Sequence, residues 1–208
     1  MNGNDYINGS VLSFTEQLAS PSPVPGGGCA CALVAAVGVA LGDMVGGHTL
    51  GKTQNSATET HMRAIMEEAQ DLRLRLLACV QKDAEAFEPL SRAYSIPKDA
   101  PDRDAILEKC LRDAAAAPLE MMDLVCEAIE LLQDFAKKGR KLVLSDAATG
   151  ISFCRGALLG AAVNVKVNTH LMKDRPYAEA INAHVDEALA NYTQMADAVF
   201  SGVYQRFC

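Results

Sequence analysis

The sequence predicts an all-α fold, with residues 1–208 forming a single-domain helical bundle. Half of the chain is hydrophobic but only 5% is aromatic, so small side chains supply most of its apolar mass. Small side chains favour close-packed helices, whereas strands draw on β-branched and aromatic residues. Apolar residues recur at helical spacing, and no segment shows a convincing strand-like alternation of period two. At 208 residues the chain is long enough for one well-buried domain and short for two.

The first part of the chain predicts a short helix and then an extended segment. Ser13-Phe-Thr-Glu16 has the form of a capping box, and the helix that it opens should run to about Ala19. Residues 20–28 read Ser-Pro-Ser-Pro-Val-Pro-Gly-Gly-Gly, which predicts an extended arm that ends in a glycine-rich turn. A buried helix of roughly twenty residues is then expected to begin near Cys29.

This buried helix carries glycines four residues apart, at Gly38, Gly42 and Gly46. Glycine inside a helix is destabilising by about 1 kcal/mol relative to alanine, so three on one face indicate the close approach of another backbone. The segment from Cys29 to Gly47 is also as apolar as a membrane span. Because Asp43 interrupts it, and basic flanks and an aromatic belt are absent, we interpret it as a core helix.

Two longer stretches follow the helical pattern. An amphipathic helix is predicted from about Asn55 to Ala93, with an apolar stripe at three- and four-residue spacing. The next stretch covers about residues 102–138, where Pro118 should kink the helix or split it in two. Gly139 is expected to end it.

The C-terminal part predicts a second small-residue helix and a last amphipathic one. Ser145-Asp146 should provide the N-cap of the small-residue helix, which carries Gly156, Gly160, Asn164 and Asn168 at intervals of four. The last helix spans about residues 176–204. Two helices with small-residue faces, together with long amphipathic helices, favour a bundle or a symmetric dimer, and we expect a homodimer.

Charge and cysteine content exclude several classes of protein. The net charge of -7 argues against a general nucleic-acid binder, because a phosphate backbone requires a basic face. The seven cysteines include no CxxC pair and no zinc-type spacing with histidine, so reduced thiols and no metal site are expected. The N-terminal residues lack the regions of a signal peptide. We therefore expect a cytoplasmic protein that does not associate with membranes.

One carboxylate lies on the wrong side of its predicted helix. At 100° per residue, Asp83 falls within about 60° of the apolar residues Leu76, Val80, Phe87 and Leu90. Burial of a carboxylate is unfavourable unless it is paired, hydrogen-bonded or protonated, and it raises the pKa toward the range of a general base or acid. Asp83 is therefore either a catalytic group or a structural aspartate satisfied by a neighbouring helix.

Other candidates rest on weaker patterns. Gly26, Gly27 and Gly28 at a helix start expose backbone N–H groups to an anion or a carbonyl group, or form only a tight turn. Asn164 and Asn168 share a face with two glycines and so point where another element comes close, which also fits plain inter-helix hydrogen bonds. The four histidines show no ligand spacing among themselves.

Short motifs occur along the chain in a fixed order, from about Ser13 to His170. They are Ala19-Ser-Pro-Ser-Pro-Val-Pro-Gly-Gly-Gly28, Met44-Val-Gly-Gly-His-Thr-Leu-Gly-Lys52, Asp83-Ala-Glu-Ala-Phe87, Ile96-Pro-Lys98, Ala117-Pro118-Leu119, Ser145-Asp146 and Asn164-Val-Lys-Val-Asn168. In combination they resemble the cyclodeaminase/cyclohydrolase family. This family comprises the C-terminal half of formimidoyltransferase-cyclodeaminase and stand-alone bacterial methenyltetrahydrofolate cyclohydrolases.

The resemblance implies an all-helical homodimer with a folate pocket lined by these motifs. It places Asp83 at the position of the catalytic aspartate, makes a tetrahydrofolate derivative the substrate, and requires no prosthetic group and no metal. The residues expected to bind substrate are Pro25, Gly26, Gly27, Gly28 and Lys52, toward the carboxylated tail, and Asp146, Asn164 and Asn168, toward the pterin.

Two reactions of that family fit an aspartate beside an amidinium-like carbon. We expect hydrolysis of 5,10-methenyltetrahydrofolate to 10-formyltetrahydrofolate, because the chain carries no formimidoyltransferase domain. The alternative is a formimidoyltetrahydrofolate cyclodeaminase, which releases ammonia. A second alternative is a helical dimer that binds folate or a partner protein without catalysis.

Overall fold

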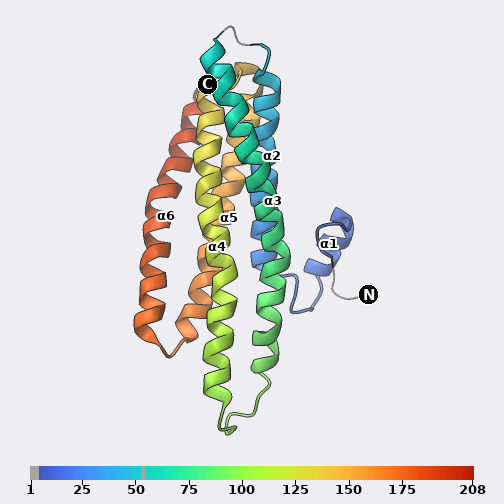
Figure 1. Cartoon of the computed structure of the whole chain (residues 1–208), viewed down its shortest axis with the longest axis vertical. Helices are drawn as coiled ribbons and strands as arrows, with labels where there is room; N and C mark the ends of the chain where they lie inside the picture. Colours follow the sequence, from blue (N-terminus) through green and yellow to red (C-terminus); the bar gives the residue numbers. More distant parts are fainter. Residues whose placement is uncertain (1–4, 53–54) are drawn as a thin grey trace.

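The computed structural model describes residues 5–52 and 55–208, and within these ranges it contains helices and no strand. The all-α prediction is therefore confirmed for the described chain (Figure 1). In chain order the elements are α1 (Val11–Leu18), α2 (Gly27–Thr49), α3 (Ser56–Ala93), α4 (Arg103–Lys138), the 3₁₀ turn η1 (Lys141–Val143), α5 (Leu144–Leu171) and α6 (Arg175–Tyr204).

Five long helices, α2 to α6, lie side by side as an elongated bundle (Figure 1). α4 and α5 pack most extensively, α2 packs against both α3 and α5, and α6 covers α5 on the far side. The apolar stripe predicted for α3 is buried at Met62, Ile65, Ala69, Leu72, Leu76, Val80 and Leu90 and half-buried at Phe87. The short helix α1 lies to one side of the bundle (Figure 1), and its Phe14 belongs to the same core cluster of buried residues.

Two helix starts differ from the sequence prediction. α1 begins at Val11 because Ser10, and not Ser13, is the N-cap: the Ser10 hydroxyl accepts a hydrogen bond from the Ser13 N–H at 3.0 Å. α5 begins at Leu144, since the 3₁₀ turn η1 leads directly into it. Asp146 therefore lies inside the first turn of α5, where an acid is favoured by the helix dipole, and is not the N-cap.

Two expectations for α4 are resolved by the fold. Pro118 is buried inside one continuous helix and does not split it. Gly139 caps the end of α4, donating its N–H to the carbonyl oxygen of Phe135 at 2.8 Å.

The glycine strip of α2 packs within the chain. A Cβ on Gly38 would lie 2.8 Å from the carbonyl oxygen of Gly150 in α5, and one on Gly42 would lie 2.8 Å from the ring of Phe135 in α4. Both distances are shorter than real Cβ contacts, so glycine allows these helices to approach. Gly156 on α5 differs, because a Cβ there would meet nothing.

α2 and the segment 141–171 are long and apolar enough to cross a membrane by length and composition, with mean hydropathies of 2.0 and 1.3. Half of each apolar window is buried inside the bundle. The expectation of a core helix over residues 29–47 agrees with this packing.

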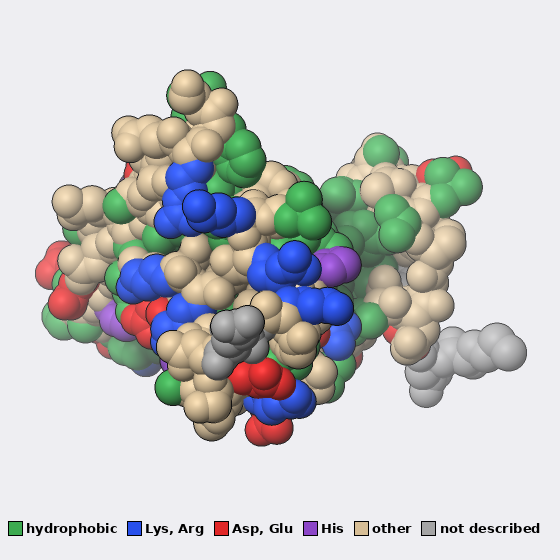
Figure 2. Space-filling model, turned by 90° about the horizontal axis from the view of Figure 1, so that it is seen from above, with side chains coloured by type: hydrophobic (Ala, Val, Ile, Leu, Met, Phe, Trp, Pro, Cys, Tyr) green, Lys and Arg blue, Asp and Glu red, His purple; other side chains and the backbone are tan. Residues whose placement is uncertain are grey.

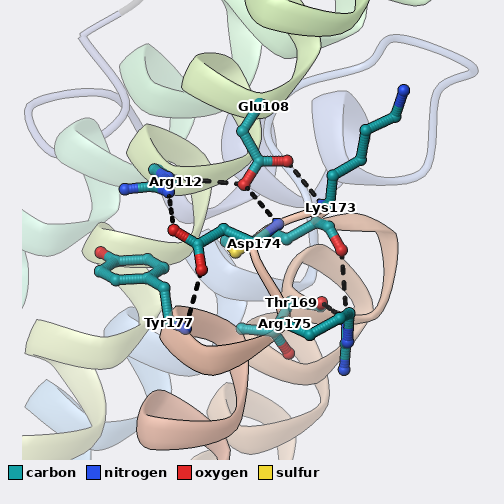
Figure 3. A network of polar contacts seen from close by, with 8 residues as sticks. Glu108, Arg112, Thr169, Lys173, Asp174, Arg175 and Tyr177 are labelled. Atoms are coloured by element: carbon teal, nitrogen blue, oxygen red, sulfur yellow. Dashed lines mark hydrogen bonds and ion pairs between the residues drawn. The ribbon is translucent and has the colours of Figure 1, made fainter.

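A polar network holds the corner between α5 and α6 against α4 (Figure 3). The Arg112 guanidinium lies 2.6 Å from the Asp174 carboxylate and 4.3 Å from the centre of the Tyr177 ring. Glu108 accepts a hydrogen bond from the backbone N–H of Lys173 at 2.6 Å. Asp174 also caps α6. These contacts fix the C-terminal end of α5, which carries Asn168, beside α4.

Candidate active site

A cavity of ≈ 140 Å³ opens where the start of α2 meets α3, α4 and α5. Its wall includes the linker before α2, through Pro23 and Val24. The structure brings to this cavity six predicted site residues that are far apart in the sequence: Gly26, Gly27, Gly28, Asp83, Asn164 and Asn168.

Asp83 faces the cavity because it lies on the same side of α3 as the apolar stripe, and that side packs against α2. A Cβ on Gly28 would lie 2.2 Å from Oδ1 and 2.5 Å from Oδ2 of Asp83. No Cβ fits at those distances, so glycine at position 28 allows the carboxyl group to lie against the first turn of α2. Asp83 is half-buried and lines the cavity, in agreement with the inward orientation that the helical spacing predicts.

Burial has the larger of two opposing effects on the pKa of Asp83. It raises the pKa, because the charged carboxylate loses hydration. Hydrogen bonds from the thiol and the backbone N–H of Cys29 lower it but do not reverse the direction. A carboxyl group with a raised pKa exchanges protons closer to neutral pH, as a general base or acid requires.

Cys29 contacts this carboxylate directly. Its Sγ lies 3.3 Å from Oδ2 of Asp83 and 3.3 Å from the carbonyl oxygen of Val80, so the thiol proton is directed at two acceptors. Burial and the charge of Asp83 raise the pKa of Cys29 to about 12, which keeps it a neutral donor. Sequence reasoning treated Cys29 as a structural thiol, because only the packing of α2 on α3 places it beside Asp83.

Two asparagines of α5 form the side of the cavity opposite Asp83's helix. Asn164 donates to the carbonyl oxygen of Gly160 at 2.8 Å, and a Cβ on Gly27 would lie 3.5 Å from its amide nitrogen. Asn168 is buried and donates to the carbonyl oxygens of Ala114 at 3.2 Å and Asn164 at 3.0 Å. Asn168 thus makes the inter-helix hydrogen bond that the sequence left open, and both residues also line the cavity.

The rest of the wall is apolar and comes from three helices. Phe87 lies one turn beyond Asp83 on α3, Pro118 comes from the middle of α4, and Val167 comes from α5. Apolar walls exclude water and strengthen electrostatic interactions near the carboxylate. The cavity therefore suits a flat organic cation, with its charge near Asp83 and its faces against these side chains.

Lys52 and Asp146 lie far from this cavity in the same chain. Lys52 is exposed beyond the C-terminal end of α2, whereas the cavity is at the N-terminal end; at 1.5 Å per residue, the 23 residues of α2 separate them by about 34 Å. Asp146 is in the first turn of α5, and the cavity residues Asn164 and Asn168 are near its other end. Pro25 is buried, and its neighbours line the cavity in its place.

A second half-buried carboxylate, that of Asp43, lies outside the cavity. Oδ1 of Asp43 is buried and makes no hydrogen bond within the described residues. Burial raises the pKa of Asp43, and the nearby charge of Arg73 opposes this. Among residues 5–52 and 55–208, no group of three His, Cys, Asp or Glu side chains is placed to hold a metal ion.

A larger groove of ≈ 950 Å³ runs along α3 and α4. Its wall is strongly acidic, whereas the smaller cavity contains one carboxylate among uncharged residues. The carboxylates of the groove are Glu67, Glu68, Asp71, Glu127, Glu130 and Asp134, against a single arginine, Arg75, and His61. Arg75 is paired with Glu127 at 3.0 Å, and His61 with Asp134 at 2.8 Å. None of the predicted site residues lines this groove, whereas six of them meet in the smaller cavity, so we place the candidate site there.

Comparisons with known proteins agree on one family. A profile described as Formiminotransferase-cyclodeaminase matches residues 10–187. The chain is 32% identical to the methenyltetrahydrofolate cyclohydrolase of Methylorubrum extorquens, over 94% of this chain and 96% of that protein. It is 29% identical to the formimidoyltransferase-cyclodeaminase of Rattus norvegicus, over 96% of this chain but 38% of that longer protein.

The fold has a solved counterpart. The structure of a formiminotetrahydrofolate cyclodeaminase from Thermotoga maritima superimposes with a TM-score of 0.82 at 26% identity, covering 95% of this chain and 98% of that one. Sequence profile, full-length similarity and fold therefore support the resemblance seen in the motifs. The chain is an enzyme that belongs to the Formiminotransferase-cyclodeaminase family.

Proposed function

We propose that this enzyme hydrolyses 5,10-methenyltetrahydrofolate to 10-formyltetrahydrofolate. The observation that carries the proposal is the carboxyl group of Asp83, held against Gly28 at the edge of an apolar cavity. The relative from Methylorubrum extorquens, which this chain covers almost end to end, bears the name of that activity. The substrate is the tetrahydrofolate derivative itself, and the reaction needs no prosthetic group.

Asp83 has two tasks in this reaction. The carbon between the two folate nitrogens is cationic, and an ionised carboxylate stabilises it and accepts a proton from the attacking water. The resulting carbinolamine collapses when the bond from carbon to one nitrogen breaks. That nitrogen gains one proton and the other proton of water leaves to solvent, so one water is consumed and one proton released.

The other cavity residues position the ring. The backbone N–H groups of Gly27 and Gly28 at the start of α2 and the side chains of Asn164 and Asn168 offer polar contacts, and Phe87 offers an apolar one. Ligand sites for molecules of this size usually occupy about 300–1,000 Å³. A cavity of ≈ 140 Å³ therefore holds the reacting ring, and the carboxylated tail extends outside it.

A cyclodeaminase is the second candidate reaction. The Thermotoga maritima structure and the rat relative carry that name. The same carboxylate beside an amidinium-like carbon would assist attack of a folate nitrogen and departure of ammonia. The other alternative expected from sequence, a dimer without catalysis, is set aside because the chain is an enzyme of this family.

The active form is a homodimer in this proposal. Exposed apolar side chains on α2 and α5 support it, as does the separation of Lys52 and Asp146 from the cavity. If two copies pack antiparallel along α2 and α5, the C-terminal end of one α2 lies beside the N-terminal end of the other. Lys52 and Asp146 of the partner subunit would then approach the cavity and meet the tail and the pterin.

We also place the enzyme in the cytoplasm, as one domain over residues 1–208 that binds no nucleic acid and no membrane. All seven cysteines are free, four of them buried, which suits a reducing compartment. The net charge of -7 suits a small-molecule enzyme better than a nucleic-acid binder.

Two assays and one variant test the function. Purified protein is mixed with methenyltetrahydrofolate, and loss of its absorbance is followed; a parallel sample with formiminotetrahydrofolate is assayed for ammonia. We expect the first signal, and kcat lowered about 10²–10⁴-fold in Asp83→Asn. Ammonia release without absorbance loss would establish the cyclodeaminase instead. Unchanged turnover in a folded Asp83→Asn variant would remove Asp83 from the mechanism.

A further inference from the structure

The wall of the cavity offers neutral hydrogen-bonding groups and a single carboxylate. Lysine and arginine side chains gather instead on the end of the bundle that faces the viewer in Figure 2, which is the upper end in Figure 1. Among the described residues that line the cavity there is no lysine or arginine, and Asp83 has the only ionisable side chain. Recognition of a ligand there depends on whether each neutral polar group donates or accepts a hydrogen bond.

Pro118 leaves one backbone carbonyl group of α4 without its usual helical partner. Proline has no N–H, so position 118 cannot donate to the carbonyl oxygen of Ala114, four residues earlier. The side chain of Asn168 in α5 supplies the missing donor, because its amide nitrogen lies 3.2 Å from that oxygen. All three residues line the cavity, so a side chain replaces a backbone donor within the cavity wall.

A second contact fixes the amide group of Asn168. Its nitrogen also donates to the carbonyl oxygen of Asn164 at 3.0 Å, which uses the second of its two N–H bonds. Asn168 is 7% exposed, and within the part of the chain that the structure describes no donor contacts its Oδ1. Because both N–H bonds are directed at backbone carbonyl groups, Oδ1 is the polar atom left for a ligand, and it can only accept.

The other polar groups of the wall differ from Asn168. Asn164 donates one N–H to the carbonyl oxygen of Gly160 at 2.8 Å, so its amide group can still both donate and accept. At the start of α2, the N–H groups of Gly27 and Gly28 have no acceptor in their own helix and can only donate. The cavity thus presents donors at the start of α2 and an acceptor between α4 and α5.

We propose that Asn168 accepts a hydrogen bond from the 2-amino group of the pterin, and that Pro118 is the positioning residue that fixes its amide group. This assignment rests on the proposed function. The reacting carbon is bonded to N5 of the pterin, near Asp83, and the C4 carbonyl oxygen lies beside N5, where α2 can donate to it. The 2-amino group is at the far end of the same ring edge. This order, an acceptor and then a donor, complements the wall groups from α2 to Asn168.

Pro118→Ala and Pro118→Val test the role of Pro118. Both variants restore an N–H at position 118, which competes with Asn168 for the Ala114 carbonyl oxygen and lets the amide group rotate. KM for methenyltetrahydrofolate, and Kd for the stable 5-formyltetrahydrofolate measured by calorimetry, should both rise about fivefold, the effect of one neutral hydrogen bond. The value of kcat should stay nearly unchanged.

Valine keeps an apolar side chain in the wall, so the two variants separate hydrogen bonding from packing. Weaker binding in Pro118→Ala alone would assign the effect to lost packing and overturn the proposal. Pro89→Ala is the matched control, because Pro89 also lies inside a helix, α3, but is exposed and does not line the cavity. This variant should leave KM and Kd unchanged.

The 2-desamino-2-methyl analogue of 5-formyltetrahydrofolate tests the partner of Asn168. The wild type should bind it about fivefold more weakly than the parent compound, because Oδ1 of Asn168 then has no donor. In Pro118→Ala the two compounds should bind with similar Kd values. An equal preference for the parent compound in both proteins would show that another group recognises the 2-amino group, and would overturn the assignment.

The link between Pro118 and Asn168 is also tested without a folate. Asn168→Ala removes the donor from the Ala114 carbonyl oxygen and should lower the urea midpoint of unfolding. The loss should be smaller in the Pro118→Ala background, where position 118 supplies an N–H. Equal losses in both backgrounds would overturn the role of Pro118. Unequal losses in a protein that neither binds nor converts a folate would support that role and count against the proposed function, and with it the pterin assignment.

Discussion

Gly28 and Asp83 lie so close together that a Cβ on Gly28 would be 2.2 Å from Oδ1 of Asp83. The position of the Asp83 carboxyl group on α3 therefore depends on the absence of a side chain in the first turn of α2. The two residues are 55 positions apart in the sequence, so it is the packing of α2 against α3 that brings them into contact.

Gly28→Ala should displace the carboxyl group of Asp83 and lower kcat at least tenfold, about 1.4 kcal/mol in activation free energy. The cavity side of Asp83 leaves room for the shift, so the variant should still fold. Gly27→Ala is the matched control, because its Cβ would lie at an ordinary 3.5 Å from the Asn164 amide. Steady-state kinetics of the two variants make the comparison; equal losses would show that the turn, and not the contact with Asp83, is what matters.

The stability of the protein should respond to pH through Asp83. Burial raises the pKa of Asp83 above its unfolded value, so its contribution to stability is complete below about pH 4 and is lost as the pH rises through the folded pKa. Asp83→Asn lacks this titration. Its free energy of unfolding, measured in urea, should therefore rise relative to the wild type between about pH 4 and pH 7.5.

Asp104→Asn is the control of opposite sign for that experiment. The ammonium group of Lys173 lowers the pKa of Asp104, so this carboxylate contributes stability above its unfolded pKa and loses it in acid. Relative to the wild type, the Asp104→Asn variant should become less stable as the pH rises. Parallel curves for Asp83→Asn and the wild type would contradict a raised pKa at Asp83.

Cys29 should set the pH range in which Asp83 is ionised. Its thiol stabilises the charged carboxylate, so Cys29→Ala should move the acidic limb of kcat/KM up by about half a unit to one unit. Cys29→Ser keeps a donor and should move it back or below the wild-type value. The thiol of Cys31 lies against Gly160, and Cys31→Ala serves as the control. If the acidic limb of the kcat/KM profile lies at the same pH in all three variants, Cys29 has only a packing role.

Mixed dimers should reveal whether the partner completes the cavity. Asp83→Asn alone should have its kcat lowered about 10²–10⁴-fold, and Lys52→Glu alone should raise KM for a polyglutamylated substrate. In a mixed dimer, the site with an intact Asp83 would receive an intact Lys52 from the partner subunit. Mixing the two variants should therefore restore turnover at low substrate concentration. If turnover does not recover in a verified mixed dimer, Lys52 of the partner subunit does not contribute to the site.

The sequence by itself determined the features that depend on local order. Helical periodicity identified the elements and placed Asp83 on the inward side of α3, because a 3.6-residue repeat assigns each side chain to a face without reference to its neighbours. The prediction that Ser13 opens α1 was wrong, because Ser10 caps the helix about one turn earlier.

Only the tertiary structure decided which of those inward faces meet. A buried face shows that a helix has a neighbour but does not identify it, so Cys29 could not be connected with Asp83 in advance. The length of α2 likewise separates Lys52, which lies just beyond its C-terminal end, from the glycines at its start, although the resemblance groups them in one site. The cavity residues come from four helices, and only the packing of these helices sets the distances between them. The candidate site could therefore be recognised only in the folded protein.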